Sequence, residues 1–192
     1  MNKRNLVDGN LERRITLILS GLPHWEEVFL EESNRYENEY SKEAFAGALL
    51  AWDYAKQNRV SIITPQYVKD INFILMTLIN QEGGEYRREK CVIELRNKKG
   101  RVIGTREDTY PPEKIGPAMN EWCKRFNDSK TSEEEIKEEH VKFLKIHPFA
   151  DGNGRTGRIL MNIQRLNSRY GIMIVTKDPA PEGAEIYGDW FK

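Results

Sequence analysis

One segment, residues 147–158, holds the densest set of chemically active side chains in the chain. His147 has an ordinary pKa near neutrality, so it is the natural general base of the segment. Asp151 offers a hard carboxylate oxygen of the kind that suits Mg²⁺ bridging phosphates. Arg155 and Arg158 are three residues apart, so on a helix they project from one face. Two guanidinium groups at this spacing predict a site for a polyphosphate.

Two predicted helices and the glycine loop between them would position these side chains. A capping box formed by Ser132 and Glu135 begins the first helix. Pro148 ends that helix, because the residue before a proline avoids the helical region. The loop contains Gly152 and Gly154, which adopt backbone conformations that other residues resist. Its N–H groups and the N-terminus of the next helix would together form a cradle for an anion.

The same glycine loop matches two other phosphate motifs only in part. Residues 152–157 read G-N-G-R-T-G and match the dinucleotide fingerprint G-x-G-x-x-G. That fingerprint requires a preceding strand, and a helix is predicted here. A P-loop requires a lysine after the glycines, and this loop has none. The plain alternative is a glycine turn between two helices with surface arginines. This alternative is disfavoured because six residues with compatible chemistry lie close together in the sequence.

The rest of the chain predicts a mainly α-helical fold with one β-hairpin. Apolar residues recur at helical spacing in three segments, 11–19, 44–52 and 68–78. Thr64 followed by Pro65 gives the last of these a capped start. Residues 86–106 differ, because two short apolar runs flank a turn at 97–100. A two-stranded ribbon is marginal by itself, so we expect it to pack on helices and to serve something at its edge.

Composition limits the class of protein. The 192 residues include 30 Lys+Arg, 30 Asp+Glu and 39% apolar residues, which fits one globular domain with zero net charge. Balanced charge argues against a sequence-independent nucleic-acid binder. No apolar run approaches the roughly 20 residues of a membrane span. The first ten residues are polar, so we expect no secretory signal and a cytoplasmic location.

The cysteines and the remaining histidines predict neither a disulfide framework nor a zinc site. Cys91 and Cys123 are the two cysteines of the chain and form no C-x-x-C pair. His24 and His140 lack any ligand spacing to them. The basic pairs at 87–88 and 124–125 are interpreted as solvated faces.

Residues 147–158 resemble the signature of the Fic family. They read H-P-F-A-D-G-N-G-R-T-G-R and match the family pattern H-P-F-x-[D/E]-G-N-[G/K]-R-x-x-R at every position. The similarity extends over most of the chain, whose helices resemble the Fic-type helical core and whose hairpin resembles the family's target-docking flap. The resemblance implies Mg²⁺-dependent transfer of AMP from ATP to a hydroxyl group of a target protein, with release of pyrophosphate.

The resemblance also implies roles for the residues of the signature. His147 would deprotonate the target hydroxyl, Phe149 would hold the loop by packing, and Asp151 would hold Mg²⁺ against the α- and β-phosphates. The phosphate cradle would consist of Gly152, Asn153 and Gly154.

The arginines of the signature and one following residue would contact the rest of the nucleotide. Arg155 would bind the α/β region of the triphosphate, and Arg158 would bind the γ-phosphate. Asn162, one helical turn further, would reach the base or the ribose, or else be an ordinary helix residue.

A second segment, residues 33–38, resembles the inhibitory motif of Fic proteins. It reads S-N-R-Y-E-N and matches [S/T]-x-x-x-E-[G/N] through Ser33, Glu37 and Asn38. A solvated polar face of a helix that begins near residue 25 is the plain alternative. The resemblance implies that Glu37 pairs with Arg158, which would leave ATP in a non-productive pose. The chain would then divide into N-terminal helices with the inhibitory helix, 1–40, and a catalytic core, 41–192.

Several functional alternatives stay open at this level. The hairpin at about residues 91–105 would dock a target protein by strand addition and present its hydroxyl to His147, or it would only pack. Self-modification is a further expected outcome, whereas nucleic acid and membranes are not expected partners. The same site could remove AMP, with Glu37 orienting a water, or transfer another nucleotide-derived group. A catalytically silent ATP-sensing module is the alternative outside the enzymes, and the intact His147 and Asp151 disfavour it.

Overall fold

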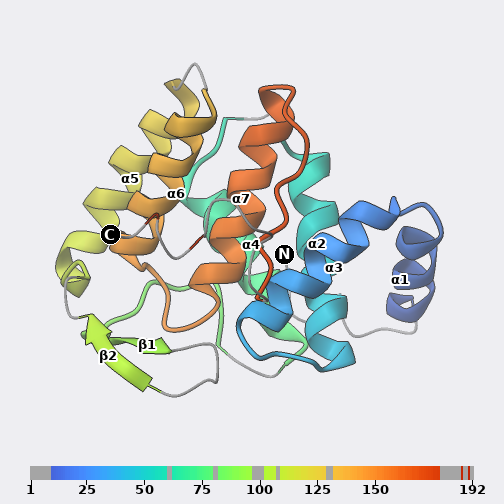
Figure 1. Cartoon of the computed structure of the whole chain (residues 1–192), viewed down its shortest axis with the longest axis horizontal. Coiled ribbons are helices and arrows are strands. Elements are labelled where there is room, and N and C mark those ends of the chain that lie inside the picture. The colour runs from blue at the N-terminus through green and yellow to red at the C-terminus, as the bar shows by residue number, and fades with distance from the viewer. Residues whose placement is uncertain are drawn as a thin grey trace.

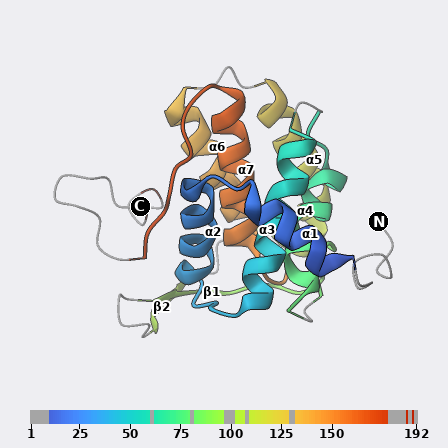
Figure 2. The same ribbon diagram turned by 90° about the vertical axis from the view of Figure 1, so that its right-hand side faces the viewer.

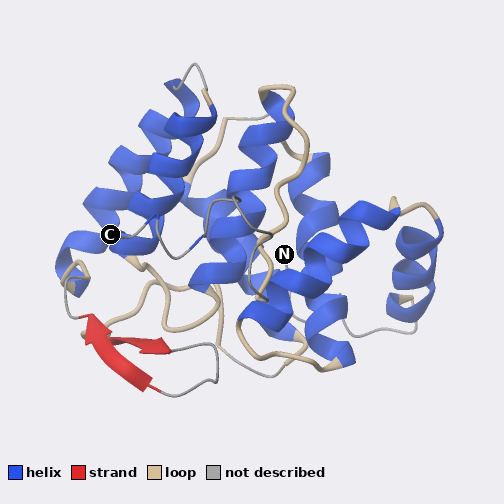
Figure 3. Cartoon of the chain, viewed as in Figure 1, coloured by secondary structure: helices blue, strands red, loops and turns tan. Residues whose placement is uncertain are grey.

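The computed structural model describes residues 10–59, 62–79, 82–96, 102–106, 109–128, 132–177, 187 and 190. These residues are mainly helical with one two-stranded antiparallel sheet, as the sequence predicts (Figure 3). The elements in chain order are α1 (Leu11–Ser20), α2 (His24–Tyr36), α3 (Lys42–Gln57), α4 (Pro65–Thr77), β1 (Ile93–Arg96), β2 (Val102–Arg106), α5 (Pro112–Asp128), α6 (Glu133–Ile146) and α7 (Asn153–Asn167). None of the helices in these ranges is long and apolar enough to cross a membrane.

Helix α7 is the central element of the fold. It contacts α2, α3, α4 and α6, which surround it in Figure 1. Of its 15 residues, 12 are buried, and several of these are polar or charged. A buried polar group is costly unless it is hydrogen-bonded. The polar side chains of α7 therefore need partners inside the molecule, and these partners define the candidate site.

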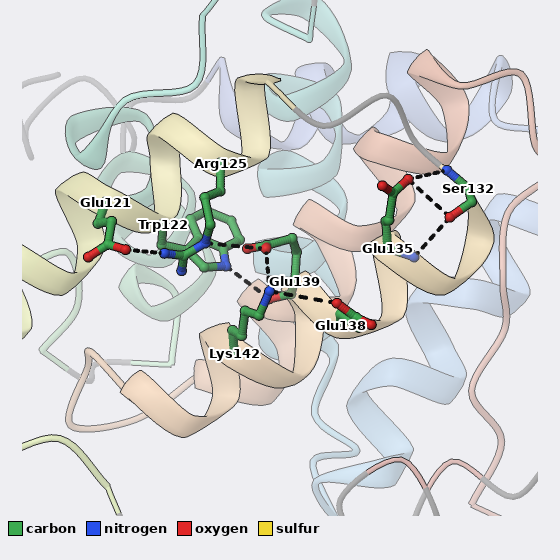
Figure 4. Close-up of polar contacts among 8 residues, drawn as sticks. All are labelled: Glu121, Trp122, Arg125, Ser132, Glu135, Glu138, Glu139 and Lys142. Carbon is green, nitrogen blue, oxygen red and sulfur yellow. Dashed lines mark hydrogen bonds and ion pairs between the residues drawn. The ribbon is translucent and has the colours of Figure 1, made fainter.

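Short-range sequence signals account for where three helices begin. The hydroxyl of Ser41 accepts a hydrogen bond from the N–H of Ala44 at the start of α3. Thr64 caps α4 in the same way, with Pro65 at the first helical position. The predicted capping box of Ser132 and Glu135 is present at the start of α6 (Figure 4).

Helices α5 and α6 are joined by a polar network that holds α6 in place (Figure 4). The indole N–H of Trp122 donates to the carbonyl of Glu139 over 2.9 Å. The Glu139 carboxylate accepts from Arg125 at 3.4 Å and from Lys142 at 2.9 Å. Glu139 is only 5% exposed; both bonds engage its Oε1, and its Oε2 has no hydrogen-bond partner among the described residues. The C-terminal end of α6, where His147 follows, is thereby fixed relative to α5.

The hairpin lies at the end of the helical bundle where α7 begins (Figures 1 and 2). Strands β1 and β2 pair antiparallel, with Ile93 opposite Arg106 and a register shift between Leu95 and Arg96. The predicted turn at 97–100 lies outside the described residues. The hairpin is therefore next to the glycine loop that precedes α7.

Candidate functional site

His147 ends α6 in a left-handed conformation. Its backbone angles are φ 51° and ψ 60°, and its N–H donates to the carbonyl of Phe143 at 3.0 Å. Pro148 prevents the helix from continuing, because a helical residue before proline would clash with the proline ring. A non-glycine residue in this region is strained, and such strain concentrates at functional sites.

The loop after His147 is held by the side chain of Asn153. The Asn153 oxygen accepts from the N–H of Phe149 at 2.9 Å, and its amide group donates to the Phe149 carbonyl at 2.8 Å. Phe149 is buried and packs on Tyr86, with ring centroids 5.8 Å apart. Because Phe149 engages both ends of the Asn153 amide, any role of Asn153 in the phosphate cradle falls to its backbone.

Gly152 is the N-cap of α7, and a side chain at its position would be strained and crowded. Its φ is +75°, and a Cβ atom there would lie 2.7 Å from the sulfur of Met76 and 2.9 Å from the side-chain nitrogen of Asn72. Asn72 is fully buried, donates to the Asp151 carbonyl at 3.1 Å and to the Thr156 hydroxyl at 3.2 Å. The sequence analysis missed Asn72, whose only signal is a polar residue within the apolar helix at 68–78.

One cavity of about 410 Å³ brings together residues from three parts of the chain. His147 and residues 150–154 of the glycine loop form part of its wall. Glu37 contributes from the C-terminal end of α2, and residues 91–93 contribute from the hairpin. The predicted base, metal ligand, cradle and inhibitory carboxylate therefore share one cavity, whose mouth includes the predicted docking flap.

The environment of His147 favours its neutral form. Burial is the largest influence and lowers the pKa of His147, and the positive charge of Arg87 lowers it further. The Leu144 carbonyl and the carboxylates of Glu37 and Asp151 act in the opposite direction without cancelling the shift. A neutral imidazole near pH 7 is able to accept a proton, as a general base must.

Arg155 is a buried cation with free donors. It is 4% exposed, and its Nη2 lies 3.4 Å from the sulfur of Met76. Its Nε and Nη1 have no hydrogen-bond partner among the described residues. Burial lowers the pKa of Arg155, against the opposing effect of Asp151 and Glu37. Unpaired donors of a buried guanidinium are rare in proteins, so Arg155 is a candidate to bind an anion.

Arg158 is buried too, and two of its three guanidinium nitrogens donate to the segment predicted to be inhibitory. Its Nε donates to the Ser33 hydroxyl at 2.9 Å, and its Nη2 donates to the Ser33 carbonyl at 2.8 Å and to Glu37 Oε1 at 2.7 Å. The ring of Tyr36 lies 5.2 Å from the guanidinium carbon. Burial alone lowers the pKa of Arg158, but Glu37 and Tyr187 raise it above its ordinary value.

The segment predicted to be inhibitory extends past the end of α2. The helix stops at Tyr36, so Glu37 is the C-cap and Asn38 lies beyond it with φ +61°. Asparagine and glycine are the residues that most readily adopt this left-handed conformation, which explains why the motif ends in G or N. Ser33 is 4% exposed, so the solvated-face interpretation is wrong for this residue.

Asn162 is not among the residues that line the cavity at His147. It is fully buried, its amide group donates to the Met173 carbonyl at 3.0 Å, and its oxygen accepts from the Met173 N–H at 2.8 Å. It thus holds the segment after α7 against the helix. A contact between Asn162 and the nucleotide would require this pair to open.

The interpretation of the basic pair at 87–88 as a solvated face is wrong for Arg87. Arg88 is exposed, but Arg87 is 7% exposed and donates to four backbone carbonyls around the end of α6. The burial of Arg87 results from long-range packing, which a charged pair in the sequence does not reveal.

Asp151 is suited to a metal ion that arrives with phosphates. Its side chain is exposed at the cavity, and Oδ1 accepts from the N–H of Gly152 at 2.5 Å, which fixes the carboxylate. The described ranges hold no group of three or more His, Cys, Asp or Glu side chains able to bind a metal without other ligands. Mg²⁺ is commonly bound by one or two carboxylates together with substrate phosphates, so this donor set fits it.

Comparison with known proteins finds a family match and partial relatives. Residues 62–164 match the Fic/DOC family. Proteins named protein adenylyltransferase Fic from Aedes aegypti and Drosophila melanogaster are each 50% identical to this chain over 38 residues, which is 20% of this chain and 8% of either relative.

Solved structures share the fold at low sequence identity. A Fic-domain-containing signaling protein from Bacteroides thetaiotaomicron aligns with a TM-score of 0.63 and 19% identity, over 91% of this chain and 73% of that protein. Fic-1 from C. elegans aligns with a TM-score of 0.59 and 15% identity, over 90% of this chain and 61% of the other.

Proposed function

Because the chain belongs to the Fic/DOC family, we propose that it is an adenylyltransferase that moves AMP from ATP to a hydroxyl side chain of a target protein. We also propose that Glu37 holds the enzyme in an inhibited state. The observation that carries the proposal is the meeting of His147, Asp151, the glycine loop and Glu37 in one cavity.

The chemistry follows from the groups at this cavity. The neutral imidazole of His147 accepts the proton of the target hydroxyl, and the hydroxyl oxygen attacks the α-phosphorus of ATP. The new bond joins this oxygen to phosphorus, and the bond between the α-phosphorus and the bridging oxygen breaks, so that pyrophosphate leaves. Most of the rate enhancement would come from orientation of the two reactants and from stabilisation of charge.

The phosphates would be held by the start of α7 and by its buried arginines. The N-terminus of a helix attracts anions through its free N–H groups and its dipole. The free donors of Arg155 suit the α/β region of the triphosphate, and the fork of Arg158 suits the γ-phosphate. Asp151 would hold Mg²⁺, which supplies charge neutralisation when it is bound with ATP.

Inhibition would arise because Glu37 occupies the position that the γ-phosphate needs. Its carboxylate pairs with Arg158 and lies against Gly154, where even the Cβ of a side chain would collide with it. A triphosphate in the productive pose would place a second negative charge at the same point. ATP would then bind only with its α-phosphorus turned away from His147.

Incubation with Mg²⁺ and ATP labelled at the α-phosphate tests both parts of the proposal. We expect little label on the wild-type protein, strong label on Glu37→Gly and none on the double variant Glu37→Gly/His147→Ala. The double variant should still bind ATP, because His147 makes no contact that the phosphate cradle needs. ATP binding without label in Glu37→Gly would instead support the silent ATP-sensing module.

A further inference from the structure

Arg87 lies in the segment that leads from α4 to β1. Its guanidinium is a buried cation whose acceptors are all backbone carbonyls. Nε donates to His147 at 2.7 Å, Nη1 to Glu89 at 2.7 Å, and Nη2 to Tyr110 and, at 3.4 Å, to Ile146.

These carbonyls belong to three separate segments of the chain. Glu89 precedes β1 and Tyr110 follows β2, so one guanidinium holds both arms of the hairpin. Ile146 and His147 form the end of α6 and carry the candidate base. A cation at the C-terminal carbonyls of a helix is also favourable because of the helix dipole.

Backbone pairing next to Arg87 strengthens the same connection. The main-chain N–H of Arg87 donates to the Pro148 carbonyl at 2.9 Å. Its neighbour Tyr86 forms an antiparallel bridge with Phe149, and the two rings pack together. The first arm of the hairpin is therefore bound directly to the loop that follows His147.

We propose that Arg87 is a positioning residue that fixes the edge of the hairpin relative to the imidazole of His147. The inference rests on the proposed function, in which the hairpin docks the target. Cys91, Val92 and Ile93 line the same cavity as His147, so a shift of the hairpin would move a docked hydroxyl away from the base. Misplacement by about 1 Å is enough to reduce an enzymatic rate by roughly 100-fold.

The charge of Arg87 adds an electrostatic link to His147 beside these hydrogen bonds. Three charged groups influence His147: Arg87 from the hairpin arm, Glu37 from the end of α2 and Asp151 from the glycine loop. Arg87 favours the neutral imidazole, whereas the two carboxylates favour the protonated form. Loss of the arginine should therefore raise the pKa of His147.

Enzyme kinetics in the Glu37→Gly protein, in which inhibition should be relieved, test the positioning role of Arg87. Arg87→Gln should reduce the maximal rate of labelling from α-labelled ATP by about 10- to 100-fold. Its dissociation constant for ATP should stay within about twofold of the parent's, since Arg87 is not part of the phosphate cradle. Arg87→Lys should recover part of the rate, because lysine keeps the charge and some donors but lacks the planar fork. Arg88→Gln, at the exposed neighbour, is the matched control and should behave as the parent.

Titration of the histidine ring signals by NMR tests the link to His147 without relying on activity. The chain has three histidines, and the exposed His24 serves as an internal reference. We expect Arg87→Gln to raise the pKa of His147 alone, and Arg87→Lys and Arg88→Gln to leave it unchanged. If Arg87→Gln loses its cooperative melting transition, the labelling rate of Arg87→Lys tests the positioning role instead.

Different results would refute the inference and the proposed function. A labelling rate and a His147 titration that are both unaltered in Arg87→Gln would overturn the positioning role. A loss of ATP affinity in proportion to the loss of rate would overturn it as well, since Arg87 would then only stabilise the fold. Absence of label in the Glu37→Gly parent would refute adenylyl transfer, and the NMR titration would still decide the role of Arg87.

Discussion

Substitution of Glu37 should release the enzyme to a degree that the contacts of Arg158 allow us to estimate. Glu37 makes one charge-assisted hydrogen bond of 2.7 Å to Arg158, and two further bonds from Arg158 go to Ser33. Glu37→Gly removes only the first of these. Glu37→Gln keeps the shape of the side chain and removes its charge.

The expected magnitude follows from the exposure of the pair. Hydrogen bonds to charged groups contribute about 1.5–3 kcal/mol. The side chain of Glu37 is 38% exposed, so solvent screening favours the lower end of this range. About 1.5 kcal/mol corresponds to roughly a tenfold change in rate. This is a minimum for Glu37→Gly, because the carboxylate would also repel the γ-phosphate at Gly154.

The assay is the initial rate of labelling from α-labelled ATP at saturating ATP and Mg²⁺. We expect an increase of at least about tenfold for Glu37→Gly and a smaller increase for Glu37→Gln. Glu31→Gln, at an exposed position of α2, is the matched control and should not change the rate. Equal rates for the wild type and both Glu37 variants would refute the assignment of Glu37 as an inhibitor.

Three further predictions follow from the same contacts. Ser33→Ala should raise the labelling rate less than Glu37→Gly does, because Arg158 keeps its bonds to the Ser33 carbonyl and to Glu37. A labelling rate at or below that of the wild type would count against a role of the Ser33 hydroxyl in inhibition. Labelling by the Glu37→Gly protein should be constant through neutral pH and fall only in acid, as His147 protonates below its ordinary pKa; a pH–rate profile that falls above pH 7 would contradict this. Gly152→Ala should lower the unfolding free energy by about 1–3 kcal/mol, measured by denaturant titration, because alanine is strained at φ +75° and lacks space there; an unchanged midpoint would be inconsistent with that geometry.

Short-range patterns were sufficient to predict most of the fold. The cap at Thr64 and Pro65, the capping box at Ser132 and the stop at Pro148 act within a few residues, so their effects are visible in the sequence. Residues 147–158 could also be interpreted from the sequence, because residue types at fixed spacing around the start of one helix already predict an anion site. Placement of the hairpin next to that site depended on the family resemblance.

Long-range burial set the limits of sequence-based prediction. Asn72 and Arg87 organise the loop and the hairpin through contacts 60 or more residues away. Their importance depends on which backbone groups they meet, and a single sequence does not encode those pairings in any local pattern. Helix α2 likewise stops at Tyr36, where Glu37 and Asn38 begin their tertiary contacts.

A crystal structure of Glu37→Gly with Mg²⁺ and a non-hydrolysable ATP analogue tests the central claim most directly. We predict the γ-phosphate on Arg158, the α/β region on Arg155 at the start of α7, and the α-phosphorus facing the imidazole of His147 across the cavity. A triphosphate bound away from these arginines, or one whose α-phosphorus faces away from His147, would contradict the proposed chemistry.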